Sequence, residues 1–363
     1  MAKKEKKKKS FLRVFLGILS VVIVLALIAA AAFFTVTYYM NSPVQNADLF
    51  TETDAITLNE DGSLLIDVRR GETSRSVGLR LERAGLIRHR LIWDIICKLN
   101  SEHVKTGTYR LQLPASPAAI HQLLISGREV LYKVTIPEGV TLKKVSQLLE
   151  EAGICSSESF MEAAQNKQLI SQYGIPNESM EGYLFPDTYL FSSGYPADRV
   201  VRTMADNFFK RLEIINPLIH TMSPQEINNI VILASIIERE YRVADEAPVM
   251  AGVFNNRIRT NMPLQSCATV EYIITEIQGK PHPKVLYYVD LEIVNPYNTY
   301  MYRGLPPGPI SAPGTVALNA AINPQTTEYL FFRLIDTASG RHYFSRTYDD
   351  HIRAGELVLK GGN

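Results

Sequence analysis

The longest apolar stretch of the chain lies close to its start. Residues 14–40 contain no charged side chain, and between residues 16 and 32 only Gly17 and Ser20 are neither large apolar residues nor alanine. At a rise of about 1.5 Å per residue, about 20 helical residues cross the core of a bilayer. A cleaved signal peptide is the alternative, but its apolar region covers only about 7–15 residues. The pattern therefore predicts a single transmembrane helix at residues 14–40.

The residues before this apolar run are strongly basic. Residues 1–13 hold seven Lys or Arg and one acid, a net charge of +6, whereas residues 14–363 have a net charge of −5. Basic flanks stay on the cytoplasmic side of a membrane. We therefore expect a cytoplasmic tail at 1–13, a single pass through the cell membrane, and an extracytoplasmic remainder. A nucleic-acid arm is the alternative for the tail, but the acidic remainder cannot neutralise phosphates, so we expect no nucleic-acid partner.

After the membrane run the apolar pattern repeats at a shift of 68 residues. Each copy predicts a short strand, a Gly turn, a helix capped by Thr with apolar residues at i and i+4, and a Gly stop. This pattern indicates tandem small βα modules at 48–128 and 129–220, which would act at least as spacers from the membrane. Seven positions are identical in the two copies: Gly71 and Gly139, Thr73 and Thr141, Val77 and Val145, Leu81 and Leu149, Glu82 and Glu150, Ala84 and Ala152, Gly85 and Gly153.

A second kind of helix begins after these modules. Ser223, Pro224 and Glu226 form a strong helix start, and between residues 230 and 237 only Ser235 is polar, so we expect a helix buried on all sides. Glu238 and Glu240 close this helix. An apolar environment raises the pKa of a carboxyl group, which suits a general acid near neutral pH.

The two carboxylates at the end of this helix lie about 200° apart around its axis, so only one can face a given cleft. The periodicity does not choose between Glu238 and Glu240. The alternative is that both are solvated and pair with Arg239 and Arg242.

Loops and a hairpin follow the buried helix. Residues 295–300 and 304–314 are rich in Asn, Pro and Gly, which favours stiff loops suited to binding. The apolar segments 329–335 and 342–345 flank a turn at 336–340 and predict a β-hairpin. Together these elements indicate an α+β chain whose mixed α/β catalytic domain spans 221–363.

The sequence offers little support for other chemistries. Cys97, Cys155 and Cys267 are odd in number and lack C-x-x-C spacing, and the histidines are isolated. The chain has no G-x-S-x-G elbow, H-E-x-x-H pair or P-loop. We therefore expect neither a metal nor an organic cofactor.

Two resemblances follow from these patterns. The strand, capped helix and Gly stop resemble the LysM-like module of bacterial envelope proteins, which binds N-acetylated glycans. Six motifs in order resemble the YceG-like endolytic murein (peptidoglycan) transglycosylases over nearly the whole chain. They are EGYLFPDTY at 181–189, ASIIERE at 234–240, VFNNRI at 253–258, MPLQS at 262–266, YNTY at 297–300 and GLPPGPI at 304–310.

The second resemblance implies a lyase that cuts nascent peptidoglycan strands beside the membrane and has peptidoglycan synthases as partners. It places the catalytic carboxylate at Glu240. Gln265, Asn298 and Tyr300 are then expected to contact the sugars, and Glu238 to orient the site, with a loop-structuring role as the alternative for each. The chain departs from the family pattern at Tyr241, where a small hydroxyl residue is usual, and at Cys267, where many relatives have Asp. A glycan-binding scaffold and a membrane-anchored hydrolase are the competing functions.

Overall fold

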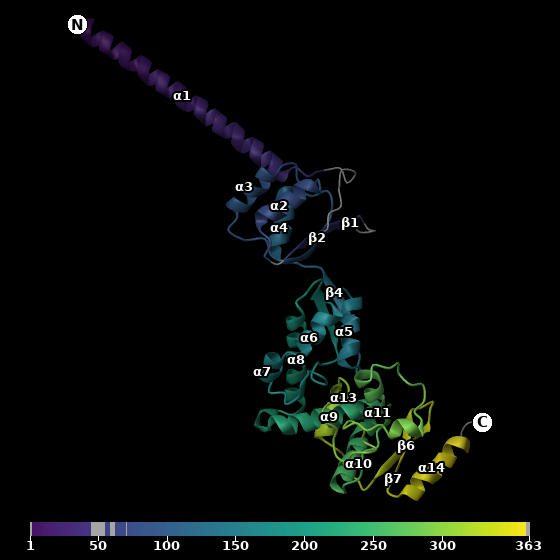
Figure 1. Cartoon of the computed structure of the whole chain (residues 1–363). Coiled ribbons are helices and arrows are strands. Elements are labelled where there is room, and N and C mark those ends of the chain that lie inside the picture. Colours follow the sequence, from purple (N-terminus) through teal and green to yellow (C-terminus); the bar gives the residue numbers. More distant parts are fainter. Residues whose placement is uncertain (1, 45–54, 59–61, 70, 361–363) are drawn as a thin grey trace. The chain divides into compact units, whose positions relative to one another are not determined.

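The computed structural model describes residues 2–44, 55–58, 62–69 and 71–360, and it is a mixed α+β structure. The chain divides into two compact units, Met1–Leu131 and Tyr132–Asn363 (Figure 1). Each unit contains a hydrophobic cluster of its own. The predicted start of the first module at residue 48 lies outside the described residues.

The first element is a single long helix, α1 (Ala2–Asn41). Its segment Phe15–Asn41 has a mean hydropathy of 2.9 and an apolar stretch with no buried residue, so by length and composition it can cross a membrane. The predicted apolar span at 14–40 therefore lies on one continuous helix. The backbone of the basic tail belongs to the same helix.

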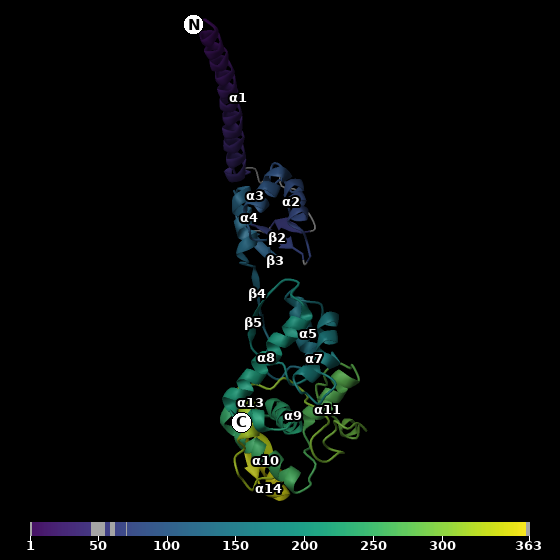
Figure 2. The same ribbon diagram turned by 90° about the vertical axis from the view of Figure 1, so that its left-hand side faces the viewer.

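The rest of the first unit is a small antiparallel sheet with three helices around it (Figure 2). The strand order is β1-β2-β3, and Ile66 lies opposite both Ile56 and Tyr109. Trp93, the only tryptophan in the sequence, is fully buried and donates from its indole N–H to the Ser74 carbonyl at 2.7 Å. The elements are β1 (Ile56–Leu58), β2 (Leu64–Val68), α2 (Ser74–Arg83), α3 (Arg90–Leu99), β3 (Gly107–Leu111) and α4 (Pro117–Ser126).

The second unit begins with another such module and continues into a larger helical region that ends in a hairpin. Strand β4 pairs with β5, and β6 pairs with β7 in the predicted antiparallel hairpin, against which α14 packs (Figure 1). The first elements are β4 (Leu131–Thr135), α5 (Leu142–Glu151), α6 (Ser157–Ala164), α7 (Lys167–Gln172), β5 (Thr188–Ser192) and α8 (Ala197–Ile215). They are followed by α9 (Pro224–Glu240), α10 (Ala247–Arg259), α11 (Cys267–Tyr272), the π-helix Ile273–Ile277, α12 (Tyr288–Leu291), α13 (Thr315–Ile322), β6 (Phe331–Asp336), β7 (Arg341–Ser345) and α14 (Tyr348–Lys360).

The sequence repeat is a repeat of local structure. Thr73 and Thr141 cap α2 and α5 with their side chains, and Gly85 and Gly153 follow these helices with φ of +74° and +69°. Glycine adopts this left-handed conformation at little cost, which is why it ends both helices. The predicted strand, capped helix and Gly stop are therefore confirmed in both copies. The closing hydrogen bonds also recur, from Leu86 N to Leu81 O and from Ile154 N to Leu149 O, both at 2.9 Å.

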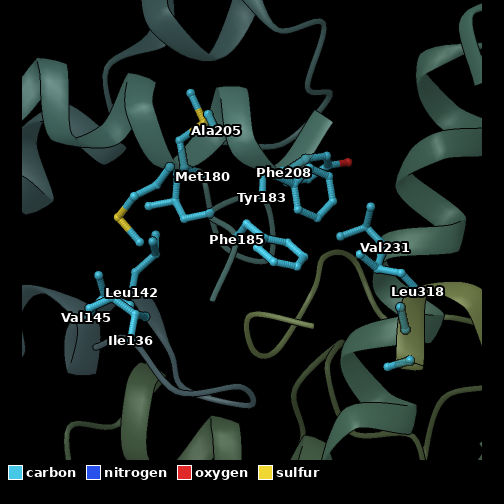
Figure 3. Close-up of a cluster of buried hydrophobic side chains, with 14 of the residues drawn as sticks. Ile136, Leu142, Val145, Met180, Tyr183, Phe185, Ala205, Phe208, Val231 and Leu318 are labelled. Carbon is cyan, nitrogen blue, oxygen red and sulfur yellow. The ribbon is translucent and has the colours of Figure 1, made fainter. Parts of the chain in front are cut away.

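The core of the second unit is continuous from the second copy of the repeat to α13. Figure 3 shows one part of it, where side chains of α5, α8, α9 and α13 gather around the segment 180–185. The Gly139 turn of the repeat also bonds to the Gly/Pro-rich loop: Gly139 N donates to Ala312 O at 2.9 Å, and Ala312 N donates to Val140 O at 2.8 Å. The second copy is thus built into the unit that carries α9.

Candidate active site

Helix α9 presents its last carboxylates from a rigid support. Ser223 and Glu226 form the predicted capping box at its start, and the residues from Val231 to Ile237 are all at most 5% exposed. The helix ends at Glu240 because Tyr241 has an extended backbone. The helix is buried on all sides, as the sequence predicted. It therefore holds the backbone of Glu238 and Glu240 in place.

Glu240 is held by a residue from another segment. The Ser266 hydroxyl donates to Glu240 Oε1 at 2.5 Å, and the Ser266 N–H donates to Thr299 Oγ1 at 3.0 Å. Burial raises the pKa of Glu240, and the nearby Glu271 adds to this effect, while the Ser266 hydrogen bond, Arg239 and Arg257 oppose it. A carboxyl with a raised pKa keeps its proton closer to neutral pH, as a general acid requires.

The residue before Ser266 has an unusual backbone. Gln265 has φ of +53°, a left-handed conformation that is uncommon for residues other than glycine. Its N–H donates to Thr299 O at 3.0 Å, and its side-chain oxygen accepts from Arg257 Nη1 at 3.3 Å. These contacts hold the backbone turn that places Ser266 against Glu240.

Glu240 opens into a cleft of about 650 Å³, which is within the size range of ligand-binding pockets. Among the residues that the structure describes, Glu240 is the only Asp or Glu in its lining. The lining comes from the end of α9, α10, the segment 264–267, the residues around Tyr300, the hairpin and α14: Arg239, Glu240, Arg242, Arg257, Leu264, Gln265, Cys267, Tyr288, Tyr300, Phe331, Phe332, Arg333, Leu334, His342, Tyr348 and His351.

Two of the four predicted sugar-contacting or orienting residues lie in this cleft with Glu240. Gln265 and Tyr300 both line it, and the Tyr300 hydroxyl lies 3.1 Å from the sulfur of Cys267. Cys267 is exposed. Its thiol occupies the position at which the family resemblance implies an Asp in many relatives.

Glu238 faces another part of the unit. Its Oε2 accepts a hydrogen bond from Gly314 N at 2.8 Å, and burial, aided by the charge of Glu138, raises its pKa to about 7. Tyr241 also bonds to Glu238 rather than to Glu240. Only one of the two terminal carboxylates therefore faces the cleft, as the helix geometry required.

Asn298 lies below the surface of its loop. It is fully buried, and its amide nitrogen donates to the carbonyls of Leu291 and Ile293 at 2.9 and 2.8 Å. Its side-chain oxygen accepts from Tyr300 N at 3.0 Å. These bonds correspond to the loop-structuring alternative, and through them Asn298 positions Tyr300.

The cleft also contains residues that the sequence did not predict to line it, chiefly four arginines and the hairpin. Arg239 pairs with Glu271 at 2.9 Å rather than with the carboxylates of its own helix. The hairpin was predicted as an element, but nothing local in its sequence indicates that Phe331 and Arg333 line the cleft of Glu240. Conversely, the buried part of the loop 304–314 packs on α9, where Ile310 N donates to Ser235 Oγ at 3.0 Å, and no residue of this loop lines the cleft.

In the described part of the chain, no three His, Cys, Asp or Glu residues form a group that could hold a metal ion. His342 instead lies 2.8 Å from Glu246 through Nδ1.

Comparison with known proteins places this site in a family. Two endolytic murein transglycosylases of Streptococcus pneumoniae, from strains R6 and D39, are each 29% identical over 93% of the chain, which spans 64% of their length. The endolytic murein transglycosylase of Bacillus subtilis is 27% identical over 82% of the chain and 85% of its own length. A crystal structure of a YceG-like protein from Listeria monocytogenes superposes with a TM-score of 0.54, at 28% identity over 80% of this chain and 98% of that one. The model of the YceG-like family matches residues 66–356, and the chain belongs to this family.

Proposed function

We propose that the protein is a membrane-anchored endolytic lytic transglycosylase of peptidoglycan, which limits the length of nascent glycan strands. One observation carries this proposal: a single carboxyl group, Glu240, lines the cleft of the described chain and has a raised pKa. Ordinary glycosidases use two carboxylates beside the scissile bond. A lytic transglycosylase uses one, because a hydroxyl group of the substrate replaces water as the nucleophile.

Glu240 acts first as an acid and then as a base in this mechanism. Its carboxyl proton goes to the glycosidic oxygen between N-acetylmuramic acid and N-acetylglucosamine, and the bond from C1 to that oxygen breaks. The substrate's own acetamido group stabilises the positive charge that develops at C1. The Glu240 carboxylate then takes the proton of the muramyl 6-hydroxyl, whose oxygen bonds to C1 and closes the 1,6-anhydro ring.

Other parts of the chain have supporting roles in the proposal. Gln265 and Tyr300 contact the sugars directly, Asn298 fixes the loop of Tyr300, and Glu238 fixes the Gly314 segment behind α9. The two repeated modules act as LysM-like glycan-binding elements before the catalytic region at 221–363. The basic tail stays in the cytoplasm, so that the cleft meets new strands outside the membrane beside peptidoglycan synthases.

The test uses the full-length chain in detergent with uncrosslinked glycan strands and mass spectrometry of the products. We expect anhydro-ended fragments from the wild type and a loss of about 10²- to 10⁴-fold in rate for Glu240→Gln, which cannot donate the proton. Glu238→Gln is the matched control, because it lies two residues away and outside the cleft, and its amide oxygen can still accept from Gly314.

Each competing function has its own outcome. Reducing muramic ends would identify a hydrolase, and binding without cleavage would identify a glycan-binding scaffold. Full activity of Glu240→Gln together with an inactive Glu238→Gln would show that the wrong carboxylate has been assigned.

A further inference from the structure

The Glu240 cleft is rich in positive charge although the chain after the basic tail is acidic. Residues 14–363 carry a net charge of −5, yet four arginines line the cleft beside its single described acid. Such a local excess of cations attracts and orients anionic ligands independently of the net charge of the protein. The four are Arg239, Arg242, Arg257 and Arg333.

Two of these arginines already have partners within the protein. Arg239 pairs with Glu271 at 2.9 Å. Arg257 is only 7% exposed and donates to the carbonyls of Leu330 and Leu264 at 2.6 and 2.8 Å. Both therefore have structural roles that account for their positions.

The other two arginines are exposed, and their guanidinium groups have no hydrogen bond or ion pair to any residue of the described chain. Arg242 follows α9, and Arg333 lies in β6. Each of these arginines packs against a glycine. A Cβ atom at Gly355 would lie 2.6 Å from Arg333 Nη1, and one at Gly340 would lie 3.0 Å from Arg242 Cβ, so a larger residue at either position would crowd the arginine.

The positive charge also acts on a neighbouring group in the cleft. The pKa of His351 is lowered first by burial and then by the charges of Arg333 and Arg257. The guanidinium charge thus reaches into the cleft and favours anions there. A guanidinium group presents a planar fork of N–H donors that matches the two oxygens of a carboxylate.

We propose that Arg242 and Arg333 form a carboxylate-binding subsite in the Glu240 cleft, which recognises the acidic groups that peptidoglycan strands carry. This inference rests on the proposed function. The carboxylates can come from stem peptides or from lactyl groups that have lost their peptide. By holding them, the subsite would align the strand so that a glycosidic oxygen lies at Glu240.

The test measures binding by the full-length chain with Glu240→Gln, so that the strands stay intact. Three strand preparations distinguish the sources of carboxylate: uncrosslinked strands with stem peptides, strands freed of peptides by an amidase, and strands whose carboxyls have been converted to methylamides. Arg242→Gln combined with Arg333→Gln is compared with the control Arg346→Gln. Arg346 is 67% exposed, pairs with Glu328 at 2.7 Å and lies outside the cleft lining.

We expect the double variant to bind carboxylate-bearing strands about tenfold more weakly, as the loss of charge-assisted hydrogen bonds implies, and to bind the methylamide strands as its parent does. The peptide-bearing or the amidase-treated strands will show the larger loss, which identifies the source. Equal affinity of parent and double variant for both carboxylate-bearing preparations would overturn the subsite, and so would equal weakening for the methylamide strands. A parent that binds no strand at all would instead overturn the proposed function, which the product assay tests separately.

Discussion

Glu240 lies among charges that act on it in opposite directions. Burial and Glu271 raise its pKa, whereas Ser266, Arg239 and Arg257 lower it. In the proposed mechanism the protonated carboxyl is the proton donor, so cleavage should slow as the pH rises through the pKa of Glu240. This loss of rate at high pH is the alkaline limb of the pH–rate profile. Single substitutions near the carboxyl group should shift this limb to higher or lower pH, depending on whether the group that is removed favours the ionised or the neutral carboxyl.

Ser266→Ala removes the hydroxyl that donates to the Glu240 carboxylate. Because that hydrogen bond favours the ionised form, its loss should move the alkaline limb of kcat/KM to higher pH. We also expect kcat to fall by about tenfold, since the carboxyl loses a positioning bond to a charged group. The measurement is the pH profile of anhydro-end formation, and a limb that moves to lower pH would refute this assignment of Ser266.

Glu271→Gln should have the opposite effect on the same profile. It removes a negative charge near Glu240 and frees Arg239 from its ion pair, and both changes favour the ionised carboxylate. The alkaline limb should therefore move to lower pH. Arg239→Gln is the companion variant, for which the limb should move to higher pH. If both variants shift the limb in one direction, the charges of this pair do not govern Glu240.

At the scale of elements, predictions from sequence succeeded where the signal was local. The Thr caps, the Gly stops, the buried helix ending at Glu240 and the hairpin each depend on residues close together in the chain. The site was harder to predict because its parts meet only through tertiary packing. Gln265 and Tyr300 were predicted by resemblance, whereas Arg242 and Arg333 carry no local signal, and the stiff loop 304–314 packs on α9 instead of lining the cleft.

Segment 180–185 and α5 are joined by one buried acid. Glu181 is 7% exposed, and both its carboxyl oxygens accept from Leu142 N in the first turn of α5, at 3.2 and 3.1 Å. Burial raises its pKa to about 8. Between about pH 4.5 and 8 the folded protein therefore holds a proton that the unfolded chain has released, so stability falls as the pH rises through this window.

Glu181→Gln should weaken this pH dependence, because glutamine stays neutral at every pH and its side-chain oxygen can still accept from Leu142 N. The measurement is the midpoint of denaturant unfolding of the second unit, monitored by circular dichroism at pH 5 and at pH 8. The difference between the two midpoints should be smaller in the variant than in the wild type. Glu178→Gln, a nearby exposed position, is the control; an unchanged difference in Glu181→Gln would contradict the prediction.

The described residues form two separate hydrophobic clusters, and each cluster contains one copy of the repeat. Leu81 and Leu149 occupy the same position of the two copies, and both are fully buried. Trp93 lies in the first cluster alone, so its fluorescence reports on the first unit, while the proposed glycan cleavage would report on the second. Leu81 and Leu149 are therefore matched positions for substitution, and each unit has its own signal.

Leu81→Ala should lower the stability of the first unit by about 2–5 kcal/mol, the usual cost of such a cavity. The Trp93 fluorescence transition should therefore move to lower denaturant, while the concentration at which activity is lost stays unchanged. Leu149→Ala should have the reverse effect. If either substitution shifts both transitions equally, the two units unfold as one cooperative system, contrary to their separate cores.

The Gly139 turn and the corresponding Gly71 turn of the first copy differ in their surroundings. In the first copy a Cβ at Gly71 would meet nothing within 4 Å, whereas at Gly139 it would lie 3.5 Å from Arg239, whose Nη1 in turn donates to Gly139 O. In the second copy the turn is therefore bonded to the end of α9, the helix that carries Glu240. A shortened chain that keeps this support should begin near Tyr132 rather than at residue 221.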